Sequence, residues 1–150
     1  MYQDEKFMKE ALKEAKKAYI KDEVPVGCVI VKDNKIIARG HNKKEKKKNA
    51  ILHAEIVALT KAQKKLNDWR LNDCTLYVTL EPCLMCTGAI IQTRINKVVF
   101  GCNDPKGGAI DTVINIKEIK NLNHSFESIS KILEKECSTI LKTYFKNKRN

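Results

Sequence analysis

The sequence predicts an α/β fold in which helices cover both faces of a central sheet. Segments with helical spacing alternate along the chain with short β-branched runs, which is typical of layered α/β domains. The 150 residues are 43% hydrophobic, enough for one domain with its own core. The longest apolar run is too short to span a bilayer and no export signal is visible. We therefore expect one cytoplasmic domain over residues 1–150, with no membrane partner.

The first part of the chain predicts a helix followed by a β-hairpin. Apolar residues recur at three- and four-residue spacing over residues 3–21, which indicates an amphipathic helix. The β-branched runs 24–31 and 35–42 flank an Asp33-Asn34 turn, as hairpin strands do. The charged run 43–49 then predicts a solvated loop, which we prefer to a phosphate-binding loop. The apolar positions of the helix are Phe7, Met8, Ala11, Leu12, Ala15, Ala18 and Tyr19.

The middle of the chain predicts a helix and then a switch from strand to helix. Residues 50–66 are expected to form a helix with His53 at its start. The run 74–80 indicates a buried strand. Pro82 ends this strand where a helix over about 84–92 can begin, because proline suits a first helical turn.

Polar and thiol side chains at the starts of these two helices suggest a metal site. Cys83 and Cys86 lie where helix N–H groups favour thiolate, although a CxxC pair also fits a redox motif or plain packing. In a reducing compartment the six cysteines favour metal or packing over disulfides. With His53 as a third ligand, tetrahedral zinc would keep one open position, as in catalytic sites. Glu55 could then carry protons rather than bind the metal.

The last third predicts one more buried strand, a polar loop and a long helix. The strand covers 96–102, and Asp104 and Lys106 follow it, where open α/β sheets place functional residues. A plain Gly/Pro turn is the alternative for this loop. Residues 109–119 are weakly β-like and 121–124 loop-like. The helical stripe to the C-terminus consists of Ile129, Ile132, Leu133, Cys137, Ile140, Leu141, Tyr144 and Phe145.

The charge of the chain is strongly positive. Lys and Arg number 29 against 18 Asp and Glu, a formal charge of +11 that suits a polyanion such as nucleic acid. Lysine-rich codon usage would give the same count, so charge alone does not decide. Tyr144 and Phe145 stand beside the basic tail 146–149, a combination that binds single-stranded nucleic acid, although a frayed basic end is the alternative.

Two short motifs resemble a known family. His53-Ala54-Glu55 with Pro82-Cys83-Leu84-Met85-Cys86 resembles the H-x-E…P-C-x-x-C signature of the zinc-dependent nucleobase deaminases. The resemblance extends over nearly the whole chain, in the order seen in bacterial tRNA-specific adenosine deaminases. The further matching stretches are 24–27, 40–42, 76–83, 94–95, 98–101 and 122–124.

The resemblance implies a fold, a reaction and partners. It implies a three-layer α/β/α cytidine deaminase-like fold with a central mixed five-stranded sheet, as one CMP/dCMP-type deaminase domain. It implies hydrolytic deamination of the wobble adenosine (A34) of tRNA to inosine, with zinc-activated hydroxide attacking C6. It also implies one Zn²⁺ per subunit, a homodimer and the tRNA anticodon stem-loop as partner.

Roles for single residues follow from the same resemblance. His53, Cys83 and Cys86 would bind zinc, and Glu55 would shuttle protons. The implied substrate contacts are Asn42 to the purine edge, Asp104 to a neighbouring nucleotide, Lys106 and Asn123 to the anticodon backbone or flanking bases, and Phe145 in the loop-binding groove.

Two other functions fit parts of the pattern. A small-molecule deaminase of the same fold, acting on guanine or cytosine, would carry the same zinc motif. A non-catalytic nucleic-acid-binding protein could hold a structural zinc with Cys74 or Cys102 as fourth ligand, but such a site has no use for Glu55. The lysines of 43–48 and the Cys102 position depart from the family pattern, and their roles stay open.

Overall fold

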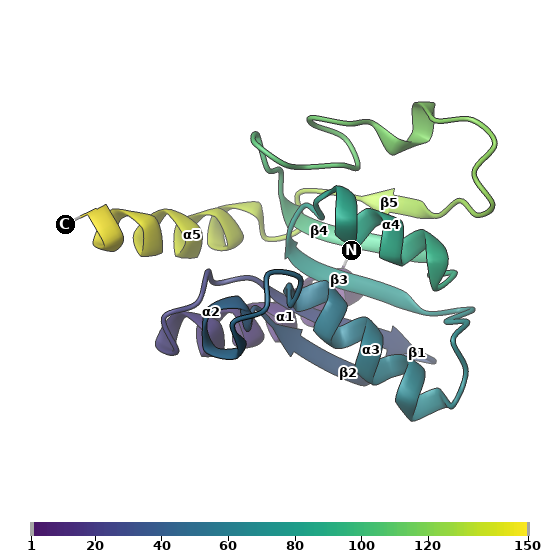
Figure 1. Ribbon diagram of the computed structural model, residues 1–150, viewed down its shortest axis with the longest axis horizontal. Coiled ribbons are helices and arrows are strands. Elements are labelled where there is room, and N and C mark those ends of the chain that lie inside the picture. The colour runs from purple at the N-terminus through teal and green to yellow at the C-terminus, as the bar shows by residue number, and fades with distance from the viewer. Residues whose placement is uncertain (1, 150) are drawn as a thin grey trace.

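The computed structural model describes residues 2–149 and shows a five-stranded sheet between two layers of helices (Figure 1). The strand order is β2-β1-β3-β4-β5. β1 runs antiparallel to β2 and β3, whereas β3, β4 and β5 run parallel to one another, so the sheet is mixed. The strands are β1 (Gly27–Lys32), β2 (Lys35–His41), β3 (Thr75–Leu80), β4 (Lys97–Cys102) and β5 (Glu127–Ile129).

The helices divide between the two faces of the sheet. α1 (Tyr2–Ile20) and α5 (Glu134–Arg149) lie on one face, and α3 (Ala54–Leu66) and α4 (Leu84–Gln92) lie on the other (Figure 1). Successive residues of a strand point to opposite faces, so β1 contributes to both cores. Its Cys28 and Ile30 pack in the α3/α4 core, and its Val29 packs in the α1/α5 core. The predicted three-layer α/β/α fold is confirmed.

The hairpin and the close packing of α1 follow from local chemistry. Asp33 and Asn34 have φ of 51° and 61°, the left-handed turn geometry that matches strand twist. α1 crosses β1 so closely that a Cβ on Gly27 would lie 1.9 Å from the carbonyl oxygen of Ala11. Only glycine fits this crossing. Among residues 2–149, no helix is both long and apolar enough to cross a bilayer.

Two predicted segments around the second helix are corrected by the structure. α3 begins at Ala54, with His53 in extended conformation as its N-cap, so residues 50–52 are not helical. Within the run predicted as a loop, Lys44–Lys47 form a short helix, α2. The physical reason is the buried carboxylate of Glu23, which accepts hydrogen bonds from the N–H groups of Glu45 (2.9 Å) and Lys46 (2.8 Å).

The predictions for the last third also need correction. Residues 109–119 form turns and one 3₁₀ turn, η1 (Ile116–Glu118), with no strand. Ile129 belongs to β5, where it pairs with Val99, and does not begin the last helix. α5 begins only at Glu134, because Lys131 and Leu133 have φ of 65° and 54°, which interrupts a helix.

The carboxylate of Glu81 organises the loop that the sequence suggested was β-like. This side chain is 2% exposed, and its oxygens accept hydrogen bonds from Ile110 N (3.1 Å), Asp111 N (2.7 Å) and Thr112 N (3.1 Å). They also accept bonds from Asp104 N, Asn103 Nδ2 and the Thr112 hydroxyl. Burial acts to raise the pKa of Glu81, but these bonds outweigh it and hold the pKa below its usual value. The loop is therefore folded around one anion.

Replacing Glu81 with alanine is expected to lower the free energy of unfolding by about 3 kcal/mol or more, because several buried or partly buried N–H donors lose their common acceptor. Urea unfolding of zinc-loaded protein measures this change. Glu118→Ala, which removes an exposed carboxylate from the same loop, should stay within about 0.5 kcal/mol of wild type. Equal stability of the two variants would show that Glu81 does not hold the loop.

Candidate metal centre and active site

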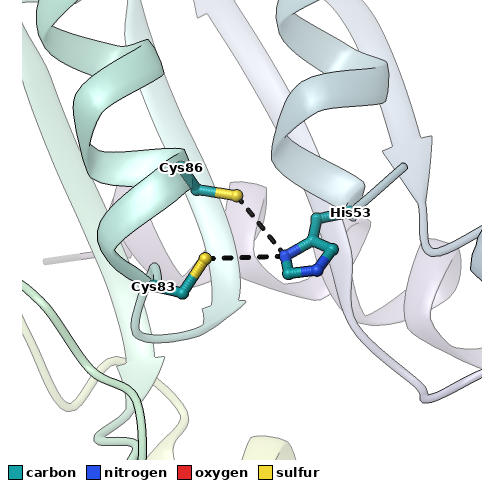
Figure 2. A group of neighbouring side chains, drawn as sticks. All are labelled: His53, Cys83 and Cys86. Carbon is teal, nitrogen blue, oxygen red and sulfur yellow. Dashed lines mark hydrogen bonds between the residues drawn. The ribbon is translucent and has the colours of Figure 1, made fainter. Parts of the chain in front are cut away.

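Three potential metal ligands converge from the N-termini of two helices (Figure 2). β3 leads into Cys83, the extended N-cap of α4, and Cys86 follows in the first turn. His53 is the N-cap of α3. Its Nδ1 lies 3.6 Å from the Sγ of Cys83 and 3.6 Å from the Sγ of Cys86. Parallel placement of α3 and α4 against one face of the sheet thus brings residues thirty positions apart together.

The spacing and chemistry of this group fit zinc. Bonds of about 2.3 Å to sulfur and about 2.0 Å to nitrogen at tetrahedral angles separate N and S by roughly 3.5 Å. The observed separations of 3.6 Å agree with this value. Two thiolates with one imidazole are also a zinc donor set. In the part of the chain that the structure describes, neither Cys74 nor Cys102 joins the group, so the three side chains would leave one position of a tetrahedral ion open.

The electrostatics of the group favour thiolate at Cys83. A hydrogen bond from Cys86 lowers the pKa of Cys83 to about 4, against the effect of burial and with further help from His53. The same hydrogen bond and burial raise the pKa of Cys86. Contact with the Cys83 sulfur raises the pKa of His53 despite its partial burial. The surroundings of Cys83 therefore favour the thiolate, the form of cysteine that binds a metal ion.

Glu55 lies beside the metal ligands without belonging to their group. It occupies the first turn of α3, is 4% exposed and borders the same cavity as His53 and Cys83. The pKa of Glu55 is raised to about 7, chiefly by burial and also by the neighbouring Cys83, while His53 opposes the rise. A carboxyl group in this position can both accept and donate a proton.

The cavity in front of this group has a volume of about 250 Å³. Asn42 forms part of its wall, directly after β2. The Oδ1 of Asn42 accepts a hydrogen bond from Ala54 N (2.8 Å), and its Nδ2 donates to Val24 O (3.0 Å). These bonds fix the amide and leave one N–H and one lone pair for a ligand. The lining residues are Glu23, Val24, Val26, Asn42, Lys44, Glu45, His53, Glu55, Leu80, Glu81, Cys83, Asp104 and Tyr144.

The structure brings only some of the sequence-predicted contacts to this cavity. Asp104 borders it, with its Oδ1 accepting from the N–H groups of Lys106 (3.0 Å) and Gly107 (3.2 Å). Lys106 is exposed and lies outside the lining, as does exposed Asn123 in the loop before β5. Phe145, 45% exposed, lines an adjacent hollow instead.

Sequence reasoning missed two parts of the cavity wall. Glu23 and Val24 come from the connection between α1 and β1, and Tyr144 comes from α5. The Tyr144 hydroxyl donates to the carbonyl oxygen of Asp22 (3.2 Å), which ties α5 to that connection. An acidic residue just before the Val24-Pro25 stretch was a usable signal. Tyr144 was singled out only as an aromatic ring beside the basic tail, and nothing local placed it on the wall of this cavity.

Comparison with known sequences places this geometry among deaminases. The profile of the MafB19-like deaminase family matches residues 2–149. The chain is 50% identical over 149 residues to the tRNA-specific adenosine deaminase of Bacillus subtilis (strain 168). This alignment covers 99% of this chain and 92% of that protein. It is 46% identical over 146 residues to the tRNA-specific adenosine deaminase of Aquifex aeolicus (strain VF5), with 97% and 96% covered.

Solved structures show the same fold. One of them comes from work on A-to-I editing by tRNA:A34 deaminases at the wobble position of transfer RNA. It matches with a TM-score of 0.87 and 40% identity, and the match covers 90% of this chain and 98% of that one. A guanine deaminase from Nitrosomonas europaea matches with a TM-score of 0.76 and 24% identity over 91% of this chain and 81% of that one. At that identity the second match concerns the fold alone.

Proposed function

Because this chain belongs to the MafB19-like deaminase family, together with the tRNA-specific adenosine deaminases of B. subtilis and A. aeolicus, we propose that it hydrolyses the wobble adenosine (A34) of tRNA to inosine. The observation that carries the proposal is the His53, Cys83 and Cys86 group with buried Glu55 beside it. It is therefore an enzyme that releases ammonia from the adenine ring. We also propose that the enzyme acts in the cytoplasm, where its tRNA substrate is found.

The metal that fits the site is one Zn²⁺ per subunit. His53, Cys83 and Cys86 would hold it, and Glu55 would stay outside its coordination. When bound, zinc supplies a Lewis acid that makes a water molecule nucleophilic at neutral pH.

Glu55 would move the protons of the reaction. Its carboxylate takes a proton from the attacking water while the water oxygen bonds to C6 of adenine. Glu55 gives this proton to N1 of the ring. It then takes the remaining proton of the new C6 hydroxyl and delivers it to the amino group, so that the C6–N bond breaks as the C6 carbonyl forms. Inosine and ammonia result, and Glu55 returns to its starting form. Its position on the cavity wall, next to the metal ligands, is what this role requires.

Substrate contacts would come from the cavity rim. The fixed amide of Asn42 has one donor and one acceptor left, which match the edge of a purine. Asp104 would meet a neighbouring nucleotide, and Phe145 would stack on an unpaired base beyond the cavity. Lys106 and Asn123 remain proposals for contacts with the anticodon backbone or flanking bases, outside the cavity itself.

We also propose that residues 1–150 act as one deaminase domain in a homodimer. Apolar side chains on α4 beside the metal ligands are exposed, with Leu84 at 56% and Met85 at 36%. Val113 and Leu122 of the loop before β5 are also exposed, at 55% and 43%. Apolar groups in such positions commonly mark a protein interface. Sedimentation equilibrium should give twice the chain mass, and a monomer would contradict this proposal.

The substrate class is tested by a panel of compounds with the same zinc-loaded protein. An anticodon stem-loop with adenosine at the wobble position should release ammonia, while free guanine, cytosine and adenosine should not react at a comparable rate. The free compounds would contact only the cavity and would lack the contacts to the RNA backbone that position the substrate. Turnover of free guanine without turnover of the RNA would instead support the small-molecule deaminase.

A further inference from the structure

A second, smaller cavity adjoins the proposed active site and is surrounded by lysines. It has a volume of about 150 Å³ and lies between the end of α1, the end of β2 and α2. Asn42 and Glu23 border both this cavity and the larger one, so the two share a wall. The lining residues are Lys21, Glu23, His41, Asn42, Lys43, Lys46 and Lys47.

The positive charges around this cavity have no compensating partners. Within residues 2–149, none of its four lysines lies within 4.0 Å of a carboxylate oxygen. Burial lowers the pKa of Lys43, and repulsion from Lys61, Lys21 and Lys47 also lowers it, while Glu14 opposes them more weakly. The one carboxylate in the lining, Glu23, already accepts two backbone hydrogen bonds from α2. A bound anion would relieve this repulsion.

A buried polar atom in the same lining also lacks a partner. His41 is 7% exposed, and its Nδ1 lies 3.3 Å from the Oε1 of Glu14. Glu14 in turn is paired with Lys17 and Arg39. The Nε2 of His41 is buried and has no hydrogen-bond partner among residues 2–149, which is rare for a buried polar atom and is compatible with a ligand at this point. Burial lowers the pKa of His41 although Glu14 opposes this, whereas a bound oxyanion would favour the imidazolium, which donates from Nε2 as well as from Nδ1.

We propose that this lysine cavity binds a phosphate oxyanion, and that in the substrate it is a backbone phosphodiester next to the target adenosine. The identity of this phosphate as part of an RNA rests on the proposed function. Because Asn42 borders both cavities, an anion in the smaller one would lie beside the base to be deaminated. It gives the lysine-rich segment 43–48 a role that composition alone did not assign. Lysine acts here as a point charge on phosphate rather than as a reader of base sequence.

The test compares binding of a fluorescent anticodon stem-loop as salt is varied, in zinc-loaded protein with Glu55→Gln to block turnover. Lys43→Gln/Lys47→Gln should weaken binding roughly tenfold at moderate salt and reduce the slope of log K against log salt by about 1.4, two contacts at about 0.7 each. Lys64→Gln/Lys65→Gln removes the same charge from the far end of α3 and should leave the slope unchanged. Melting temperatures check that all variants are folded.

Two outcomes would overturn the assignment to RNA. Equal loss in both lysine pairs would mean that only overall charge matters, and no loss in either would mean that the cavity does not touch the backbone. Inorganic phosphate distinguishes the sources of the anion. Phosphate could raise the melting temperature of wild type but not of Lys43→Gln/Lys47→Gln, while the slope of log K against log salt for RNA is the same in both proteins. The cavity would then bind free phosphate instead of the RNA backbone.

The same measurements separate this proposal from the function on which it rests. A wild-type protein that forms no inosine, yet shows the slope difference, would overturn the deamination and leave the phosphate site standing. Inosine formation without any slope difference would overturn the phosphate site alone.

Discussion

Replacing Glu55 with glutamine is expected to lower the rate of adenosine deamination about 10³-fold, within the range of general acid–base catalysis. Glutamine keeps the size of the side chain but cannot carry a proton between the water, N1 and the amino group. Zinc content and thermal stability should stay at wild-type values, because Glu55 is not one of the three ligands. Single-turnover rates with an anticodon stem-loop and metal analysis of the same sample measure both quantities.

A matched control uses another carboxylate of the same cavity. Glu45 borders it but is exposed and does not belong to the group of metal ligands, so Glu45→Gln should change the rate only a few-fold. Loss of zinc from Glu55→Gln would make Glu55 a ligand and refute its role as proton carrier. Full activity in Glu55→Gln would assign the proton transfer to another group.

Replacing His53 with alanine, or Cys83 with serine, is expected to remove bound zinc and reduce deamination to background. Each change takes away one of the three ligands found within residues 2–149, so that two would remain to hold zinc. Chelation of wild-type protein should have the same effect, and added Zn²⁺ should restore activity to wild type but not to His53→Ala. Atomic absorption of dialysed protein gives the metal content.

Cys74→Ala is the matched control for the thiol ligands. Cys74 comes directly before β3, whereas Cys83 follows the other end of that strand, so the two thiols cannot share an ion. Zinc should remain bound in this variant. Loss of zinc from Cys74→Ala without loss of fold would support the four-ligand structural site and contradict an open catalytic position.

The metal ligands could be predicted from sequence because their chemistry is local. Pro82 and Cys83 end a strand and begin a helix, and a histidine at the start of another helix has one place to meet them once both helices lie on the same face of a sheet. The start of that helix was predicted too early, at residue 50. Apolar periodicity continues into residues 50–52, but the chain there is extended and delivers His53 as an N-cap.

The walls of the cavity could not be predicted in the same way, because they depend on contacts between distant segments. Tyr144 reaches the site only because α5 packs back against the connection after α1, where it donates to Asp22. The loop from Asn103 to Thr112 takes its shape from one buried carboxylate, Glu81, rather than from its own propensity. Its β-branched residues therefore misled the strand prediction.

The most direct test of the central claim is to locate inosine in a tRNA. A transcript with adenosine at position 34 is incubated with zinc-loaded protein, and reverse transcription reads each inosine as guanosine. We predict complete conversion at position 34 and none at other adenosines or with Glu55→Gln. Retention of adenosine at position 34, in a sample whose zinc content and fold are intact, would contradict the proposed function.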